Sequence, residues 1–451
     1  MTALALVALA TAVVAVLVRR LVPVDRGRGV LVFLALSDLV AAGGQTAPSG
    51  IRSIALLVAV VLLVCAVPGQ VEERRTAQAP LAPGLLLFSG SVLLTGLVHP
   101  STVEATLWLA ALALPAMLAA RRCGDRDVSV VKGGVVVLAV IETCLAAWEH
   151  LVVGGPRVWD YVAAGQAPLA NPFLDGQIRV AGSLSHPIPL GALCAVAALV
   201  ALTSGRRTRT QNTLLLLLCS SGLLLSGSRS AVLALLAGAV VVLLQSAPDR
   251  RLRRLLVVAP LVALAAPLAG ADLAEAASSL LASGSWTNRA EGIASVPGLL
   301  GRAPSAVLLG EGFGSEDDLR LRGLLNQNGF ASVDNQFVTT LATQGLLGTA
   351  LLALSLVGSW VRGDRGHRAV VVAFLVLCCS FDLLRWPAVL VLFLVLFALP
   401  TTPAPETTAS DALTDRKEPA PCPTTSDAAD ASTPSWPRET ASATSAPNSP
   451  A

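Results

Sequence analysis

Two polar residues stand at the start of an apolar stretch in the segment SVDNQFVTTLATQGLLG, residues 332–348. Asp334 and Asn335 precede a run that the apolar pattern predicts to be one long helix, from residue 336 to Trp360. A carboxylate at the amino terminus of a helix has three uses: it can cap the helix, act as a general base, or hold an ion. The choice depends on which other charged residues lie near it.

Two arginines lie at the ends of apolar segments, where an anion could bind, and a third lies in a long loop. Arg229 stands in LLLSGSRSAVLALL, between two apolar segments joined by almost no loop, and Arg179 stands in QIRVAGSLSHPIPLG before another. Arg289, in SWTNRAEG, belongs to a longer polar region. The guanidinium group presents its donors in a fork that matches phosphate oxygens. The alternative is ordinary surface charge, with Arg229 snorkelling at a membrane boundary.

His186 is the only histidine that the sequence places close to these arginines. A histidine at the end of an apolar segment serves structure more often than catalysis, so we assign His186 and Asn335 either to acceptor binding or to structure. The sequence has no P-loop and no HExxH motif. Its eight cysteines show no CxxC spacing, so we expect no disulfide framework, no metal site and no cofactor.

The composition is that of a membrane protein. Of the 451 residues, 54% are hydrophobic and 14% are charged, and the formal net charge is +3. Apolar runs long enough for a helix to cross a bilayer recur along most of the chain, so we predict an all-α polytopic membrane protein with about 12–13 transmembrane helices. The predicted spans are 2–18, 30–47, 51–67, 81–98, 102–120, 133–153, 186–203, 211–227, 229–246, 254–270, 336–360, 367–381 and 386–400.

Positive charge sets the predicted orientation, because short loops rich in Lys and Arg face the cytoplasm. The basic loops are 19–28, 71–75, 121–132, 205–209, 250–254 and 362–368. They fall at every second loop of the span list, which places the amino terminus outside and the carboxyl terminus inside the cytoplasmic (inner) membrane. The three arginines and Asp334 then all lie at the outer face.

The distribution of apolar spans and loops divides the chain into three regions. Residues 1–153 hold the amino-terminal transmembrane helices, and residues 154–400 hold a second membrane region with a long extracytoplasmic loop at 271–335. The aromatic and leucine residues of this loop favour an ordered structure. Residues 401–451 are rich in Pro, Thr, Ser and Ala, so we predict a disordered cytoplasmic tail.

Several short motifs follow one another in a fixed order. The pattern R-x-x-G-x-x-x-H-P runs from Arg179 to Pro187, S-G-S-R ends at Arg229, and the long loop carries Arg289 and the segment LLGEGFGS. The pattern D-N-x-[FY]-x-x-x-L-x-x-x-G-L-L-G then begins at Asp334. Each motif is weak alone, but the ordered set resembles the O-antigen ligase and O-antigen polymerase superfamily over roughly residues 170–380.

The resemblance implies a membrane glycosyltransferase. Such enzymes transfer a saccharide from an undecaprenyl-pyrophosphate carrier to an acceptor hydroxyl at the outer face of the cytoplasmic membrane. The implied partners are a lipid-linked oligosaccharide donor, a glycan, lipid or protein acceptor, and the membrane, with no nucleic acid. By motif position the donor pyrophosphate falls to Arg229 and Arg289, with Arg179 as a third member. Ligases carry a histidine as the base where this chain has Asp334, so the chain departs from the ligase pattern there.

The chemistry suits these residue types. Fixed arginines in a water-poor site stabilise the charge that develops on a leaving pyrophosphate. The attacking hydroxyl needs a base, and Asp334 is the candidate.

Two other functions stay open at this point. A secondary transporter of a small solute would use ionisable residues within its spans, for which Asp38, Glu104, Glu142 and Asp382 are candidates, but no internal repeat is visible. A polyprenyl-phosphate-sugar-dependent glycosyltransferase would carry an acidic pair in its first outward loop. The corresponding loop here, AAGGQTAPSG, has no acid.

Overall fold

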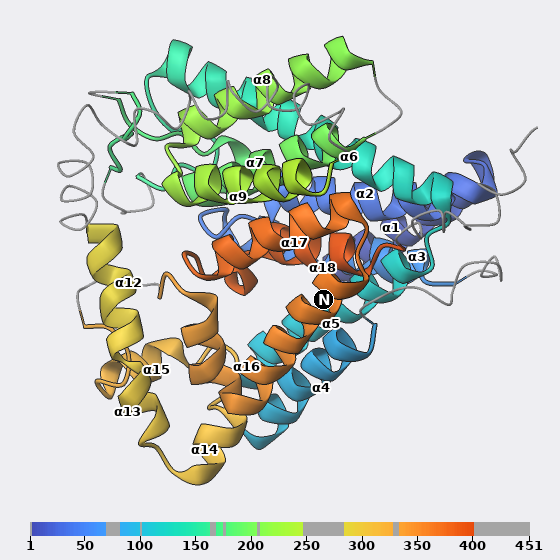
Figure 1. The fold of residues 1–451 in the computed structure, drawn as a ribbon. Helices are drawn as coiled ribbons and strands as arrows, with labels where there is room; N and C mark the ends of the chain where they lie inside the picture. Colours follow the sequence, from blue (N-terminus) through green and yellow to red (C-terminus); the bar gives the residue numbers. More distant parts are fainter. Residues whose placement is uncertain are drawn as a thin grey trace, which may run out of the picture. The chain divides into compact units, whose positions relative to one another are not determined.

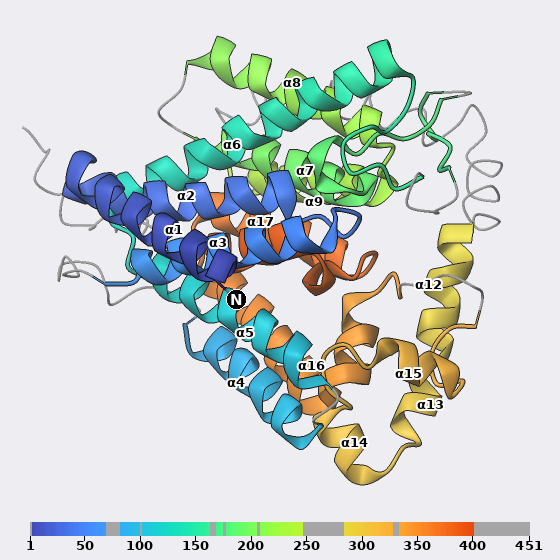
Figure 2. The same cartoon turned by 180° about the vertical axis from the view of Figure 1, so that it is seen from behind.

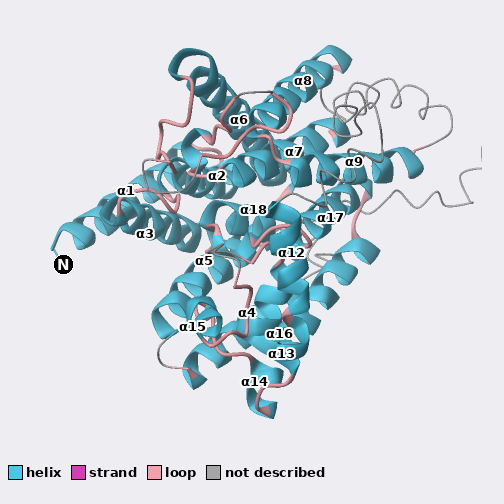
Figure 3. Ribbon diagram, turned by 90° about the vertical axis from the view of Figure 1, so that its left-hand side faces the viewer, coloured by secondary structure: helices cyan, strands magenta, loops and turns pink. Residues whose placement is uncertain are grey.

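The computed structural model describes residues 2–68, 82–99, 102–162, 168–174, 177–204, 208–246, 284–327 and 333–400. These residues form helices joined by loops, without a β-strand among them (Figure 3). The predicted all-α polytopic fold is therefore confirmed. The predicted span 254–270 and the predicted tail 401–451 lie outside the described residues.

The helices follow the predicted spans closely. The amino-terminal region contains α1 (Thr2–Leu21), α2 (Val24–Ala42), α3 (Ser49–Ala66), α4 (Ala82–Val98), α5 (Val103–Arg121) and α6 (Asp125–Trp148), which the π-helical turn η3 (Glu149–Val153) extends. Next come the 3-10 turn η4 (Gly182–Leu184), α7 (Pro187–Thr203), α8 (Arg209–Ser226) and α9 (Arg229–Leu244). The described part of the long loop contains α12 (Gly284–Ala294), α13 (Val296–Leu300), α14 (Pro304–Leu309) and α15 (Glu316–Leu321). The chain continues with α16 (Gln336–Arg362), α17 (Arg365–Cys378), the 3-10 turn η5 (Leu383–Arg385) and α18 (Pro387–Ala398).

Several of these helices can cross a membrane. Within the described residues, α3, α5, α16 and the continuous helix formed by α6 and η3 are long and apolar enough to span a bilayer. The shorter helices α7, α8, α9 and α18 are also apolar. Helices are the expected solution, because a spanning segment has to satisfy its backbone hydrogen bonds internally. The chain is a multi-pass membrane protein.

Three of the loops at the predicted cytoplasmic end lie together. The Arg28 Nε donates to the Ala66 carbonyl oxygen (3.0 Å), and the Arg122 Nη1 donates to the Val67 carbonyl oxygen (2.7 Å). The Asp127 Oδ1 accepts from the Gly29 amide (2.6 Å). These bonds join the start of α2, the end of α3 and the start of α6, so the structure keeps these loops at one end of the bundle.

The start of α2 differs from the prediction. The apolar run predicted a span over 30–47, whereas the helix covers Val24–Ala42 and so begins inside the basic loop. The helix can begin there because Arg28 is bonded to the Ala66 carbonyl oxygen and Asp25 is paired with Arg126. Gly29 allows the close approach of α6, since a Cβ there would lie 2.7 Å from the Asp127 carbonyl oxygen.

Helix α7 lies at the centre of the bundle and packs against α6, α8, α9 and α17 (Figures 1 and 2). Its small residues let these neighbours approach closely, as in other membrane bundles. At Gly191, for example, a Cβ would lie 2.7 Å from the Ser228 Cβ at the start of α9.

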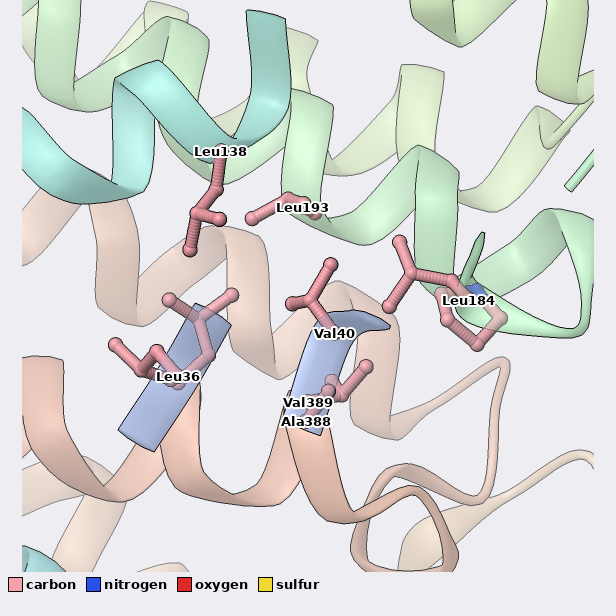
Figure 4. A pocket seen from close by; sticks show the side chains of 9 residues that line it. Leu36, Val40, Leu138, Leu184, Leu193, Ala388 and Val389 are labelled. Atoms are coloured by element: carbon pink, nitrogen blue, oxygen red, sulfur yellow. The ribbon is translucent and has the colours of Figure 1, made fainter. Parts of the chain in front are cut away.

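A small pocket lies between α2, α6, α7 and α18 (Figure 4). Its lining residues are all apolar: Leu36, Val40, Leu138, Leu184, Pro189, Leu193, Ala388, Val389 and Leu392. It therefore offers no group that could hold a phosphate or act on a hydroxyl, and any site for that chemistry has to lie elsewhere.

Helix α16 is broken, although the sequence predicted one uninterrupted helix over this region. Gly345 has φ 65° and ψ −165°, which divides the helix into residues 336–344 and 346–362. A Cβ at Gly345 would lie 2.4 Å from the Leu308 carbonyl oxygen of α14. Glycine is thus required twice over here, for its positive φ and for the close approach of a second backbone.

We expect Gly345→Ala to destabilise the protein and Gly358→Ala to be tolerated. A side chain in the left-handed region costs about 1–2 kcal/mol, and the contact with Leu308 adds to it. Gly358, in the same helix, has open space around the position of a Cβ and no positive φ. Thermal unfolding of the purified chain in detergent checks this, and equal midpoints for the two variants would contradict it.

Candidate functional site

The predicted site residues come together at the end where α7 and α9 begin. Arg179 interacts electrostatically with Arg229 and with Asp334. Arg289 interacts electrostatically with the same two residues. The loop before α7, the start of α9, helix α12 and the segment before α16 therefore contribute to one charged cluster.

Arg179 is tied to the end of α8. Its Nε donates to the Ser226 carbonyl oxygen (2.7 Å), and its own carbonyl oxygen accepts from the Tyr161 hydroxyl (2.9 Å). The first bond orients the guanidinium group, and the second fixes the backbone of Arg179. Burial lowers the pKa of Arg179 to about 10, so the group stays charged at neutral pH.

A tight turn places Arg229 beside Arg179. Gly227 ends α8 with φ 60°, and a Cβ there would lie 3.0 Å from the Arg179 Cγ. The Ser228 Oγ accepts from the Ala231 amide (3.4 Å), which caps α9. Arg229 is the first residue of α9 and is half-buried. The S-G-S-R motif is thus explained locally, with glycine for the turn and serine for the cap.

Arg289 reaches the site from α12. Its Nη2 donates to the Ser380 carbonyl oxygen at the end of α17 (3.2 Å). The neighbouring Asn288 is buried, and its Oδ1 accepts from the Asn326 Nδ2 (2.6 Å), which anchors the helix. Burial lowers the pKa of Arg289, and the nearby Asp334 opposes that shift.

Two buried carboxylates, from Glu149 and Glu142, hold the loop that carries Arg179. Glu149 accepts four backbone amides: its Oε1 from Arg157 (2.7 Å) and Val158 (2.9 Å), and its Oε2 from Ala181 (3.2 Å) and Gly182 (2.8 Å). Glu142 accepts from the Ser183 amide (2.8 Å) and hydroxyl (2.6 Å).

The sequence reasoning missed Glu149, although a glutamate inside the predicted span 133–153 was a signal. Glu142 was considered there only as a transporter group. The structure gives both carboxylates a positioning role next to the site, because each binds the turn at residues 181–183.

His186 starts α7. Its Nδ1 accepts from the Ile188 amide (3.3 Å), so that nitrogen carries no proton in this arrangement. Its ring packs between those of Tyr161 and Trp386, with centroid distances of 5.9 Å and 5.3 Å. The geometry thus gives His186 a structural place beside Arg179.

Asn335 caps α16, and Asp334 does not. The Asn335 Oδ1 accepts from the amides of Phe337 (3.0 Å) and Val338 (3.2 Å). The sequence analysis considered capping for Asp334, but asparagine is an equally good cap and Asn335 takes that place. Asp334 is half-buried and interacts electrostatically with Arg179 and Arg289. Its carboxylate is thereby directed to the charged cluster rather than to the helix.

Asp382 is a further carboxyl group at this end, in the turn between α17 and η5. It is only 2% exposed, and the side chain of Thr339 lies beside its carboxyl group. Burial raises its pKa well above the usual range, and the negative charges of Glu316 and Asp334 raise it further. The sequence reasoning treated Asp382 as a transporter candidate, but the structure places it within electrostatic range of Asp334.

No group of three or more His, Cys, Asp or Glu side chains within the described ranges is arranged to hold a metal ion. The cluster is therefore built from guanidinium groups, a carboxylate and a buried carboxyl. Such a set can bind an anion and accept a proton beside it.

Comparison with known families matches residues 214–353 to the family described as O-antigen ligase. The matched segment contains Arg229, Arg289 and Asp334, while Arg179 and His186 lie before it. A search of curated proteins found no match to the chain.

We expect Asn335→Ala to lower the stability of the protein by about 0.5–2 kcal/mol, the usual cost of losing a helix cap. Asp334→Asn is expected to leave the two capping bonds intact, because Asp334 makes neither of them. Unfolding midpoints check the loss in Asn335→Ala, and hydrogen–deuterium exchange at the Phe337 and Val338 amides distinguishes the two residues. Faster exchange at these amides in Asp334→Asn than in Asn335→Ala would show that Asp334 is the cap.

Proposed function

We propose that the chain is a glycan ligase or polymerase, because residues 214–353 match the family described as O-antigen ligase. In this proposal it transfers a saccharide from an undecaprenyl-pyrophosphate carrier to an acceptor hydroxyl. The observation that carries the proposal is that Arg179 and Arg289 each interact electrostatically with both Arg229 and Asp334, so that the four residues form one charged cluster.

The arginines are proposed to bind the donor pyrophosphate. Guanidinium groups hold phosphate oxygens in a defined geometry and keep their charge when partly buried. The bonds of Arg179 to the Ser226 carbonyl oxygen and of Arg289 to the Ser380 carbonyl oxygen support this role, because both groups are held in place before a donor arrives. Preorganised charge of this kind stabilises a leaving group without further rearrangement.

Asp334 is proposed to be the general base. It takes the proton of the acceptor hydroxyl while the acceptor oxygen forms a bond to the anomeric carbon of the donor sugar. The bond from that carbon to the pyrophosphate oxygen breaks, and undecaprenyl pyrophosphate leaves with the electron pair. The cap at Asn335 supports this role, because it fixes the start of α16 directly next to Asp334.

The proposed site of action is the outer face of the cytoplasmic (inner) membrane, with the amino terminus outside and the carboxyl terminus inside. In support, the basic loops at the starts of α2 and α6 gather at one end, and the proposed site lies where α7 and α9 begin. The positive-inside rule assigns the basic end to the cytoplasm. The proposed partners are a lipid-linked oligosaccharide donor and a glycan, lipid or protein acceptor.

Transfer by the purified chain in lipid nanodiscs tests the proposal, with an undecaprenyl-pyrophosphate-linked oligosaccharide as both donor and acceptor. We expect Arg229→Ala and Arg289→Ala to weaken binding of undecaprenyl pyrophosphate and to lower transfer by about a hundredfold. Asp334→Asn is expected to keep that binding and to lower transfer by about 10²–10⁴-fold.

Arg320→Ala is the matched control, because Arg320 lies in the same loop and its Nη1 pairs with Asp317 (2.7 Å). Its binding and transfer are expected to equal those of the wild type. Full transfer by the Arg229 and Arg289 variants would overturn the donor site, and full transfer by Asp334→Asn would overturn the base.

A further inference from the structure

The break in α16 leaves a short helix whose carboxyl end has no continuing turn. Residues 336–344 begin at the Asn335 cap and stop at Gly345. The carbonyl groups of the last turn of a helix need donors from outside it. In a membrane protein such groups are costly to leave unpaired. The question is which part of the chain supplies the donors.

Arg302 of the long loop supplies two of them. Its Nη2 donates to the Leu341 carbonyl oxygen (3.0 Å), and its Nη1 donates to the Ala342 carbonyl oxygen (2.9 Å). The same side chain bonds the Leu299 carbonyl oxygen through Nε (2.8 Å). Only 5% of this side chain is exposed, and all three of its nitrogens are engaged in these bonds.

The loop backbone supplies two further donors. The Glu311 amide donates to the Ala342 carbonyl oxygen (3.2 Å), and the Gly312 amide donates to the Thr343 carbonyl oxygen (2.8 Å). Gly310 has φ 78°, and a Cβ there would lie 2.2 Å from the Thr343 carbonyl carbon. The first glycine of the LLGEGFGS motif is thus explained by the contact of one backbone with another, whereas a Cβ at Gly312 would meet the Thr102 side chain.

Glu311 completes the arrangement. Its Oε1 lies 3.3 Å from the Arg302 Nη1, and its Oε2 pairs with Arg322. Arg302 therefore has a counter-ion, and its positive charge lies at the negative end of the helix dipole of residues 336–344. The loop and the short helix form one bonded unit.

This unit ends at the proposed site. Asp334 precedes the amino end of the short helix, and Arg302 binds its carboxyl end, about 12 Å further along the axis at 1.5 Å per residue. Arg302 thus cannot act on the reacting atoms themselves, but it controls the helix that carries the proposed base.

We propose that Arg302 is a positioning residue. Together with Glu311 it stabilises the break at Gly345 and so holds Asp334 next to the arginine cluster. The proposal rests on the proposed function in one respect, that Asp334 acts in transfer. Arg302 thereby differs from the proposed donor-binding arginines, because its charge is paired with Glu311 within the protein.

The test compares Arg302→Met, Arg302→Lys and the control Arg320→Met in the full chain in nanodiscs. For Arg302→Met we expect kcat for transfer to fall by about tenfold to a hundredfold, the effect of a small misplacement of a reacting group. Its Kd for undecaprenyl pyrophosphate is expected to stay within about twofold of wild type, since the donor contacts are untouched. Arg302→Lys keeps the positive charge but not the forked set of donors, so its kcat should lie between those of the wild type and Arg302→Met. Arg320→Met should match the wild type.

Hydrogen–deuterium exchange supplies a readout that does not depend on activity. Exchange in Arg302→Met is expected to rise in peptides 308–313 and 336–345 and to stay unchanged in peptide 365–378 of α17. If Arg302→Met raises exchange throughout the chain, the rise confined to peptides 308–313 and 336–345 is measured in Arg302→Lys instead.

Two results would overturn the proposal: a Kd weakened as in Arg229→Ala, or a kcat unchanged despite faster exchange in both peptides. Unchanged exchange in both Arg302 variants would show that Arg302 does not stabilise the short helix. A wild type that neither binds undecaprenyl pyrophosphate nor transfers glycan would defeat the proposed function, while the exchange results would still decide whether Arg302 holds the short helix.

Discussion

The structure depends on one constraint: a polar group inside a membrane protein has to find a partner within the chain. The break at Gly345 exposes this constraint most clearly, because it removes the helical partners of several carbonyl groups. Arg302 and the backbone of residues 311–312 replace those partners. The long loop, whose aromatic and leucine residues favour an ordered structure, is thereby bound to a membrane helix.

The same constraint shapes the other side of the site. Glu149 satisfies amides from two stretches of the loop before α7, and Arg179 satisfies a carbonyl group at the end of α8. Each charged side chain bonds backbone groups and so fixes the segment it belongs to. The remaining charges interact with one another. They belong to Arg179, Arg229, Arg289 and Asp334, and the segments that carry them are held in place. That is the condition for electrostatic catalysis, in which fixed dipoles and charges are ready before the reaction begins.

Much of this could be predicted from the sequence, because apolar length and charge distribution are local properties. These properties located most of the described helices, and the arginines predicted to face outward, together with Asp334, indicated the cluster. The break at Gly345 could not be predicted, since a glycine in an apolar helix reads as a packing position unless its distant neighbour, Leu308, is known. Capping was considered for Asp334 and falls to Asn335, which is equally suitable by residue type. Glu149 was missed because its four partners lie 8–33 residues away along the chain.

A structure of the chain with a bound undecaprenyl-pyrophosphate-linked oligosaccharide is the most direct test of the central claim. The account predicts pyrophosphate oxygens within hydrogen-bond distance of the Arg229 and Arg289 guanidinium groups, with the anomeric carbon of the first sugar on the side of Asp334. A pyrophosphate bound instead at the basic end, near Arg28 and Arg122, would contradict it.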